Sequence, residues 1–250
     1  MPRFARSELM EKFKEADASF RKAIEVNPRF IPPYIRLGNL YLDFDYDKEA
    51  AQVFQNAVLA NDGDADRIGM YDEDGNFVDS HHLLLILLLY LYKYKNLRGK
   101  VVFTFSVTDK LKKMAEKFGL PYEITKVGFK YIAEIMTKED VLVGGEESGG
   151  LAVKGHIPER DGIWMGLLVL EFMAKTGKTV KGLVQEVYDE VGAFAFDRDD
   201  LHITEAQKVS VVDHCNRRAY TAFGSYKIQG VEDLDGWKFL LGDEKWIMIR

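Results

Sequence analysis

The sequence predicts an α/β protein that begins with repeated helices and ends in an incomplete α+β unit. Between residues 80 and 200, helical patterns alternate with short apolar strands, as in a sheet covered by helices. Before residue 60, small and aromatic residues recur at a fixed period, which is typical of helical hairpin repeats. The predicted domains are residues 1–60, 61–79, 80–200 and 201–250.

The composition is that of a globular protein. Hydrophobic residues make up 47% and charged residues 30%, with a net charge of -6. Because this charge leaves no basic stripe for a phosphate backbone, we expect no nucleic-acid partner. The single cysteine, Cys215, cannot form an internal disulfide, and the first twenty residues lack the pattern of a secretory signal. We therefore expect a cytoplasmic protein.

The first element is a helical repeat. Three residues recur with a period of 34: Ala16, Phe20 and Ala23 reappear as Ala50, Phe54 and Ala57. Between them stand the large and small residues of a tetratricopeptide repeat: Tyr34, Leu37, Gly38 and Tyr41, with Pro28 closing the earlier unit. Two interpretations stay open: a groove that binds a peptide or protein, and a helical cap with only a structural role. About one and a half repeats favour the cap, because such repeats need about three units to bury a core.

The second element is an acidic loop, "NDGDADR". Asp62, Asp64 and Asp66 alternate, and two carboxylates about 4 Å apart repel by roughly 4 kcal/mol at an effective dielectric near 20. Such crowding of hard oxygen donors predicts a cation, Mg²⁺ or Ca²⁺. Arg67 beside the loop suits a phosphate oxygen held between metal and guanidinium, as in phosphoryl transfer.

Two other interpretations of this loop compete with the phosphoryl-transfer site. In a calcium EF-hand, the aspartates would take positions 1, 3 and 5 and Glu73 position 12, but Arg67 stands where Gly is needed and no helix follows. The segment "EDGN" instead predicts a turn between strands "RIGMY" and "FVD", a hairpin that we expect to be isolated and marginal. A solvated acidic turn is the second alternative.

Helices and strands then alternate. The run "LLLILLLYLYKYK" is apolar for about a dozen residues, whereas a bilayer takes about 20, so a buried helix over about 80–94 is expected and no membrane partner. Strand "KVVFTFS", helix "DKLKKMAEKFG", strand "PYEIT", helix "FKYIAEIM" and strand "DVLVGG" follow. A long helix begins at about Asp161. A further helix, "TEAQKVSVVDHCNRRAYTAF", precedes strands with open edges, which are prone to self-association.

The strand "DVLVGG" leads into "GGEESGG", residues 144–150. Its glycines allow the backbone to approach a ligand, and Glu146 can accept hydrogen bonds from two neighbouring sugar hydroxyls. A plain glycine-rich turn explains this motif equally well.

The order and spacing of five segments resemble the α-D-phosphohexomutases, the phosphoglucomutase and phosphomannomutase family. They are "NDGDADRIGMYDEDGNFVD", "TKVGFKYI", "GGEESGG", "ERDGIWMGLLVLE" and "GVEDLDGWKFLLGDEKWIMIR". The resemblance covers residues from about 60 to 250. It implies an α/β/α third domain and an incomplete fourth domain. It also implies reversible phosphoryl transfer between positions 1 and 6 of a glucose or mannose phosphate, with Mg²⁺ as cofactor.

The resemblance also implies roles for individual residues. Asp62, Asp64 and Asp66 would bind Mg²⁺, and Arg67 would steady the phosphoserine of the family. The remaining assignments concern substrate: Glu146 and Ser148 for the sugar hydroxyls, Lys130 for its phosphate, and Arg160 for similar duty.

The family's phosphoserine loop is not found in the sequence, and its last phosphate loop is cut at the position of Arg250. No catalytic nucleophile is identified, because Ser148 has no evident base and Cys215 shows no sign of activation. The expectation is a fused and truncated chain that binds hexose phosphate weakly without independent turnover, unless another chain supplies the missing parts. The alternative is a tetratricopeptide-type scaffold. Histidines such as His81 and His82 are expected to be solvated or capping groups.

Overall fold

The computed structural model describes residues 3–26, 33, 36–37, 40–41, 44, 46 and 59–250. Its first element is α1 (Arg3–Val26). Leu37 and Tyr41 are 1% and 5% exposed, and Phe13, Phe20 and Ile24 of α1 pack against them. The repeat itself stays a prediction, because Pro28, Tyr34, Gly38, Ala50, Phe54 and Ala57 lie outside the described residues.

The main sheet has the strand order β5-β4-β6-β7. Its strands are β4 (Lys100–Thr104), β5 (Tyr122–Thr125), β6 (Val141–Gly145) and β7 (Leu151–Val153). β4 runs parallel to β5 and β6, whereas β7 is antiparallel to β6 with Val143 opposite Val153. The parallel strands are those predicted from the alternating pattern. β7 was not predicted, since its three apolar residues gain their strand geometry only by pairing with β6.

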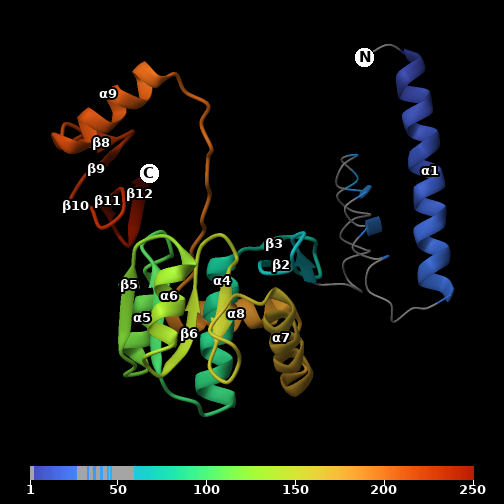
Figure 1. Cartoon of the computed structure of the whole chain (residues 1–250), viewed down its shortest axis with the longest axis horizontal. Helices are drawn as coiled ribbons and strands as arrows, with labels where there is room; N and C mark the ends of the chain where they lie inside the picture. Colours follow the sequence, from blue (N-terminus) through green and yellow to red (C-terminus); the bar gives the residue numbers. More distant parts are fainter. Residues whose placement is uncertain are drawn as a thin grey trace.

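Helices cover both faces of this sheet, so the region is an α/β/α sandwich (Figure 1). The helices are α4 (Ser80–Leu89), α5 (Lys110–Lys117), α6 (Phe129–Met136), α7 (Gly162–Thr176) and α8 (Val180–Val191). Val101 and Phe103 of β4 belong to one core cluster with α4, α5, α7 and α8. Val102 belongs to the opposite cluster with Ile132 of α6. The period-two alternation of β4 thus divides the core between two layers.

The predicted leucine-rich helix is buried from Ser80 to Leu91, which confirms a core position. It divides into α4 and the π-helical turn η1 (Tyr90–Tyr94), where the Lys95 amide donates to the Tyr90 carbonyl over 3.0 Å. The Tyr90 ring stacks on Phe172 of α7 with centroids 4.7 Å apart. Within the part of the chain that the structure describes, none of the helices has the length and apolar character needed to cross a bilayer.

The expectation that His81 and His82 are solvated was wrong, because they are 1% and 8% exposed. His82 does sit at the helix start, where the Asp79 carboxylate accepts from its backbone amide. Its ring also bonds Asp79 (2.7 Å) and the Tyr188 hydroxyl (2.9 Å). His81 Nδ1 accepts from the Thr108 amide over 3.1 Å. Burial lowers the pKa of His81 to about 4.

The hairpin after the aspartate loop is not isolated as expected. β1 (Leu59–Asn61), β2 (Ile68–Tyr71) and β3 (Phe77–Val78) form an antiparallel sheet in that order. β1 was not predicted, since its three residues carry no alternating pattern. Ile68 and Met70 enter the main core cluster, and Leu59 lies against Gly166 of α7. The hairpin is therefore stabilised by burial against the α/β/α region.

Residues 192–204 lead without helix or strand to a C-terminal unit. It contains α9 (Glu205–Asn216), β8 (Ala222–Phe223), β9 (Tyr226–Lys227), β10 (Gly230–Glu232), β11 (Trp237–Gly242) and β12 (Lys245–Ile249). α9 ends earlier than predicted, because Arg218 takes a left-handed φ of 55° that an α-helix cannot contain. The predicted domain boundaries and self-association stay predictions.

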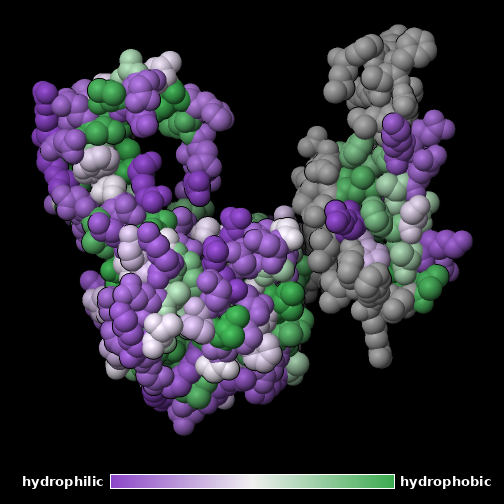
Figure 2. Space-filling view, viewed as in Figure 1, coloured by the Kyte–Doolittle hydropathy of each residue, from purple (hydrophilic) through white to green (hydrophobic). Residues whose placement is uncertain are grey.

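The C-terminal unit contacts the α/β/α region through charge and aromatic rings. Glu244 pairs with Lys113 over 2.7 Å and also with Lys110. Lys238 is 1% exposed, and its ammonium lies 4.8 Å from the ring centroids of both Phe105 and Trp246. Figure 2 shows a mostly hydrophilic surface on the viewed face, with apolar residues exposed singly or in small groups.

Candidate functional site

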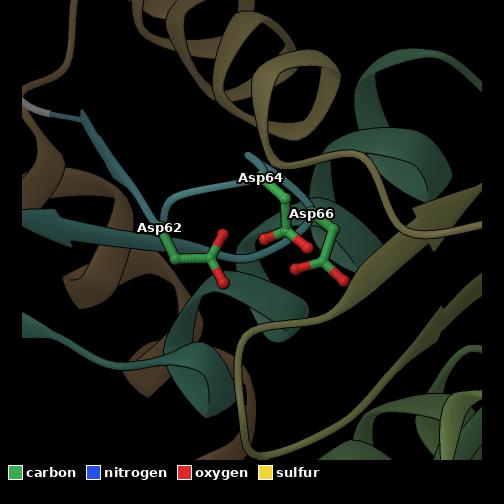
Figure 3. A group of neighbouring side chains, drawn as sticks. All are labelled: Asp62, Asp64 and Asp66. Atoms are coloured by element: carbon green, nitrogen blue, oxygen red, sulfur yellow. The ribbon is translucent and has the colours of Figure 1, made fainter.

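The three aspartates lie together on the loop between β1 and β2, as predicted from their spacing. One carboxylate oxygen from each can be chosen so that all lie within 4.8 Å of one another. Figure 3 shows the Asp64 and Asp66 side chains next to each other, with the Asp62 carboxylate directed toward them. A tight turn creates this arrangement: the Ala65 amide donates to the Asp62 carbonyl over 3.2 Å, and Ala65 takes a left-handed φ of 59°.

Arginines neutralise part of this charge. Arg67 donates from Nε to Asp62 Oδ2 over 2.6 Å and from its amide to Oδ1 over 3.2 Å. Burial acts to raise the pKa of Asp62, but these hydrogen bonds outweigh it and lower the pKa. Arg160 Nη2 lies 2.7 Å from Asp66 Oδ2. Burial, helped by the charges of Asp64 and Asp62, nevertheless raises the pKa of Asp66.

One oxygen of the cluster has unmet bonding capacity. Among the described residues, Asp66 Oδ1 is buried without a hydrogen-bond partner. Arg67 Nε lies 3.5 Å from it, which is an ionic contact but too long for a good hydrogen bond. Carboxylate oxygens are the donors that Mg²⁺ and Ca²⁺ prefer, and an orphaned buried oxygen is stabilised by a new positive partner. The residues present therefore fit a hard divalent cation.

The second part of the site is the turn of residues 146–150 between β6 and β7. Glu146 is 5% exposed, and its Oε1 accepts from the Gly128 amide over 2.9 Å. Burial and the neighbouring Glu147 charge raise the pKa of Glu146. Glu147 accepts hydrogen bonds from the hydroxyls of Thr104, the last residue of β4, and Ser106, which anchors the turn to the end of the sheet. Ser148 is exposed at the tip.

The structure joins this turn to the aspartate loop through backbone contacts. The Ile68 amide donates to the Gly149 carbonyl over 3.1 Å, and an antiparallel bridge pairs Arg67 with Gly150. The Gly162 amide at the start of α7 donates to the Ala65 carbonyl over 2.9 Å. Two motifs that are about 80 residues apart in the sequence thus form one site. Sequence reasoning named both motifs but not their junction.

Arg160 and Lys130 were predicted to bind substrate phosphate. The Arg160 side chain lies against Gly150, pairs with Asp66, and holds its guanidinium carbon 5.6 Å from the Phe129 ring centroid. Lys130 is exposed on the first turn of α6, with its ammonium 4.9 Å from the Tyr131 ring centroid. Arg160 therefore belongs to the site, and Lys130 lies on the helix whose N-cap, Gly128, donates to Glu146. The phosphate-binding roles of Lys130 and Arg160 stay predictions. The role of Arg67 in steadying a phosphoserine also stays a prediction.

Comparisons with known proteins show which family this part of the chain resembles. Residues 79–191 match the family model described as phosphoglucomutase/phosphomannomutase, alpha/beta/alpha domain III. Residues 79–191 are therefore similar to the third domain of the phosphohexomutases. The aspartate loop lies just before this domain III, and the turn 146–150, Lys130 and Arg160 lie inside it.

Individual relatives agree with the family model. The phosphoglucosamine mutase of Rubrobacter xylanophilus is 39% identical over 138 residues, covering 54% of this chain and 31% of the relative. The phosphoglucosamine mutase of Carboxydothermus hydrogenoformans is 37% identical over 130 residues, which cover 52% of this chain and 29% of the relative. The chain thus spans about a third of the length of these phosphohexomutases.

Solved structures extend the similarity beyond domain III. A crystal structure described as that of a phosphomannomutase from Thermus thermophilus is 37% identical, with a TM-score of 0.65 and coverage of 77% of this chain and 39% of that chain. The parafusin phosphoglucomutase of Paramecium, in its open form, is 25% identical with a TM-score of 0.60 and coverage of 77% and 37%.

Proposed function

We propose that residues 59–191 form the cation-binding and sugar-binding parts of a phosphohexomutase site. The reaction class is phosphoryl transfer between positions 1 and 6 of a hexose phosphate, with Mg²⁺ as the cation. The observation that carries the proposal is the junction of the two loops, which sets three clustered carboxylates beside a buried, partly desolvated Glu146. The domain III match supports it independently.

Each group has a physical role within this proposal. Asp62, Asp64 and Asp66 would hold Mg²⁺, which when bound supplies positive charge that stabilises phosphoryl oxygens. Arg67, fixed by two hydrogen bonds to Asp62, presents its remaining guanidinium N–H donors beside the cluster. Glu146 and Ser148 would bind sugar hydroxyls, and the Gly128 amide fixes the orientation of the Glu146 carboxyl group.

The proposal assigns binding, rather than turnover, to this chain. The sequence carries no motif of the family's phosphoserine loop, and phosphoryl transfer through the enzyme needs an activated nucleophile. Activity would therefore require groups supplied from outside these residues. Lys130 and Arg160 are assigned to the substrate phosphate as weaker parts of the same proposal.

Isothermal titration of the full chain with MgCl₂ and then glucose 1-phosphate tests this assignment. We expect Asp64→Asn to weaken Mg²⁺ binding on the order of tenfold, because the exposed Asp64 offers an oxygen donor beside two other carboxylates. We expect Glu146→Gln to weaken sugar-phosphate binding with little effect on Mg²⁺.

Asp199→Asn is the matched control, since it removes one exposed carboxylate from the segment between α8 and α9. Equal effects of Asp64→Asn and Asp199→Asn on Mg²⁺ binding would contradict the cation assignment. Glucose 1-phosphate binding that is insensitive to Glu146→Gln would contradict the sugar assignment.

A second candidate function is peptide or protein binding by the helical segment. It is favoured by the packing of Phe13 and Phe20 on Leu37 and Tyr41, which directs the charged side of α1 to solvent. Binding to a peptide library that depends on Arg36, an exposed residue of this segment, would support it. Binding unchanged in Arg36→Ala would count against it.

A further inference from the structure

We propose that Arg160 is an exchangeable counter-ion that competes with the divalent cation for Asp66 and thereby couples the cation loop to the sugar-binding turn. The proposal rests on the proposed function, because it concerns the same two loops. It gives Arg160 a positioning and regulatory role in addition to the phosphate contact assigned above.

The position of Arg160 between the two loops is the first observation. Its Nη2 lies 2.7 Å from Asp66 Oδ2, on the cation loop. Its aliphatic stem lies against Gly150, in a space that any side chain at residue 150 would fill. Its guanidinium carbon lies 5.6 Å from the Phe129 ring centroid. Arg160 therefore touches the aspartate loop, the turn 146–150 and the start of α6 at once.

The second observation is that the Arg160–Asp66 pair is incompletely bonded. In the described part of the chain, Asp66 Oδ1 and Arg160 Nε are both buried without a hydrogen-bond partner. A guanidinium and a carboxylate can form two parallel hydrogen bonds, whereas this pair has one short contact. A partly buried charge pair with a buried, unsatisfied atom on each side has a partly uncompensated desolvation cost. Such a pair is suited to exchange, because another cation at Asp66 would satisfy the orphaned oxygen.

The third observation is the carboxylate on the other side. Glu146 Oε2 also faces Gly150, at 3.2 Å from the point where a Cβ would stand. The Arg160 charge favours ionised Glu146, opposing the burial that raises its pKa. Arg160 thus pairs with Asp66 and acts on Glu146 through its charge, while its Nε lies 3.5 Å from Glu159 Oε1. When a cation takes Asp66, the guanidinium loses one partner, and its attraction to Glu146 or to an anionic ligand there becomes stronger.

Thermodynamic linkage gives the consequence. If cation binding changes the affinity of the turn 146–150 for its ligand, ligand binding changes cation affinity by the same factor. Arg160 places a charged side chain against both loops, so its removal should abolish the coupling between cation binding and ligand binding. A purely structural role predicts a different result. If Arg160 only held the two loops together, its removal would let the aspartates move apart and would weaken cation binding.

Titration of the full chain with MgCl₂ distinguishes these roles. We expect Arg160→Met to bind Mg²⁺ roughly three- to tenfold more tightly than the wild type, since a partly exposed competing charge is removed. Arg160→Lys keeps the charge and should give an intermediate affinity. Arg217→Met is the matched control, because Arg217 pairs with Asp213 on α9 over 2.8 Å. It should leave Mg²⁺ affinity unchanged.

Glucose 1-phosphate titrations with and without MgCl₂ supply the second measurement. The wild type should show a Mg²⁺-dependent affinity, and Arg160→Met should show none. If a folded Arg160→Met binds Mg²⁺ no more tightly than the wild type, the counter-ion proposal is overturned. The proposed function still stands in that case, provided that the wild type binds Mg²⁺. Absence of Mg²⁺ binding in the wild type overturns both. Far-ultraviolet circular dichroism verifies the fold of each variant.

Discussion

Gly149 joins the two loops of the site, and its replacement by alanine should separate them. Gly149 has φ +95°, and a Cβ there would meet the Ile68 carbonyl oxygen at 2.8 Å and the Ile68 amide nitrogen at 3.3 Å. A left-handed conformation costs a non-glycine residue about 1–2 kcal/mol. Displacement of Ile68 also weakens the hydrogen bond from its amide to Gly149, worth about 1 kcal/mol. We expect a total of about 2–3 kcal/mol.

Amide hydrogen exchange measures this effect locally. A loss of about 2–3 kcal/mol in the opening free energy should speed exchange of the Ile68 amide roughly 30- to 150-fold. Mg²⁺ affinity should fall as well, because the turn supports the loop that carries Asp66.

Gly155→Ala is the matched control. Gly155 has φ +84°, but nothing lies within 4 Å of an added Cβ, so this variant carries the backbone cost without the steric one. It should leave Ile68 exchange and Mg²⁺ affinity near the wild-type values. The reasoning is refuted if Gly149→Ala exchanges at Ile68 no faster than Gly155→Ala.

Two further predictions concern stability. Burial holds the pKa of His81 at about 4, below the unfolded value of 6.5, so the unfolded state binds a proton first and stability falls as pH drops from 6.5 to 4. Between pH 7 and 4.5, the free energy of unfolding measured in urea should fall by about 2–3 kcal/mol more in the wild type than in His81→Asn, whose side chain keeps a hydrogen-bond acceptor but does not titrate. Equal decreases in the two proteins would contradict this. Phe172→Ala should lower the free energy of unfolding, measured in urea, by about 3–5 kcal/mol, because the ring is fully buried and stacked on Tyr90. Phe77→Ala, at a ring 60% exposed, is the control and should cost far less.

The alternating helices and strands of the α/β/α region could be predicted because local pattern and tertiary environment agree there. β4 and β6 are short apolar runs that become buried parallel strands, and the leucine-rich run becomes the central helix. β1 and β7 escaped prediction, since three residues carry too little periodicity and their pairing partners stand elsewhere in the chain.

The candidate site was predicted in its parts but not in its assembly. Spacing alone indicated that Asp62, Asp64 and Asp66 would converge, because the signal lies within one loop. The pairing of Arg160 with Asp66 joins residues 94 positions apart and depends on how α7 meets the hairpin. The burial of His81 has the same origin: its neighbours Thr108 and Phe196 come from other elements.

The start of α7 places two glycines one helical turn apart. A Cβ at Gly162 would meet the Arg67 carbonyl oxygen at 2.6 Å, and one at Gly166 would meet Leu59 at 2.7 Å. Each glycine costs the helix up to about 1 kcal/mol relative to alanine. Alanine at either site would gain helix propensity only by displacing the Arg67 carbonyl or Leu59 from its place against α7. The two glycines therefore set how closely the aspartate loop and β1 can approach this helix.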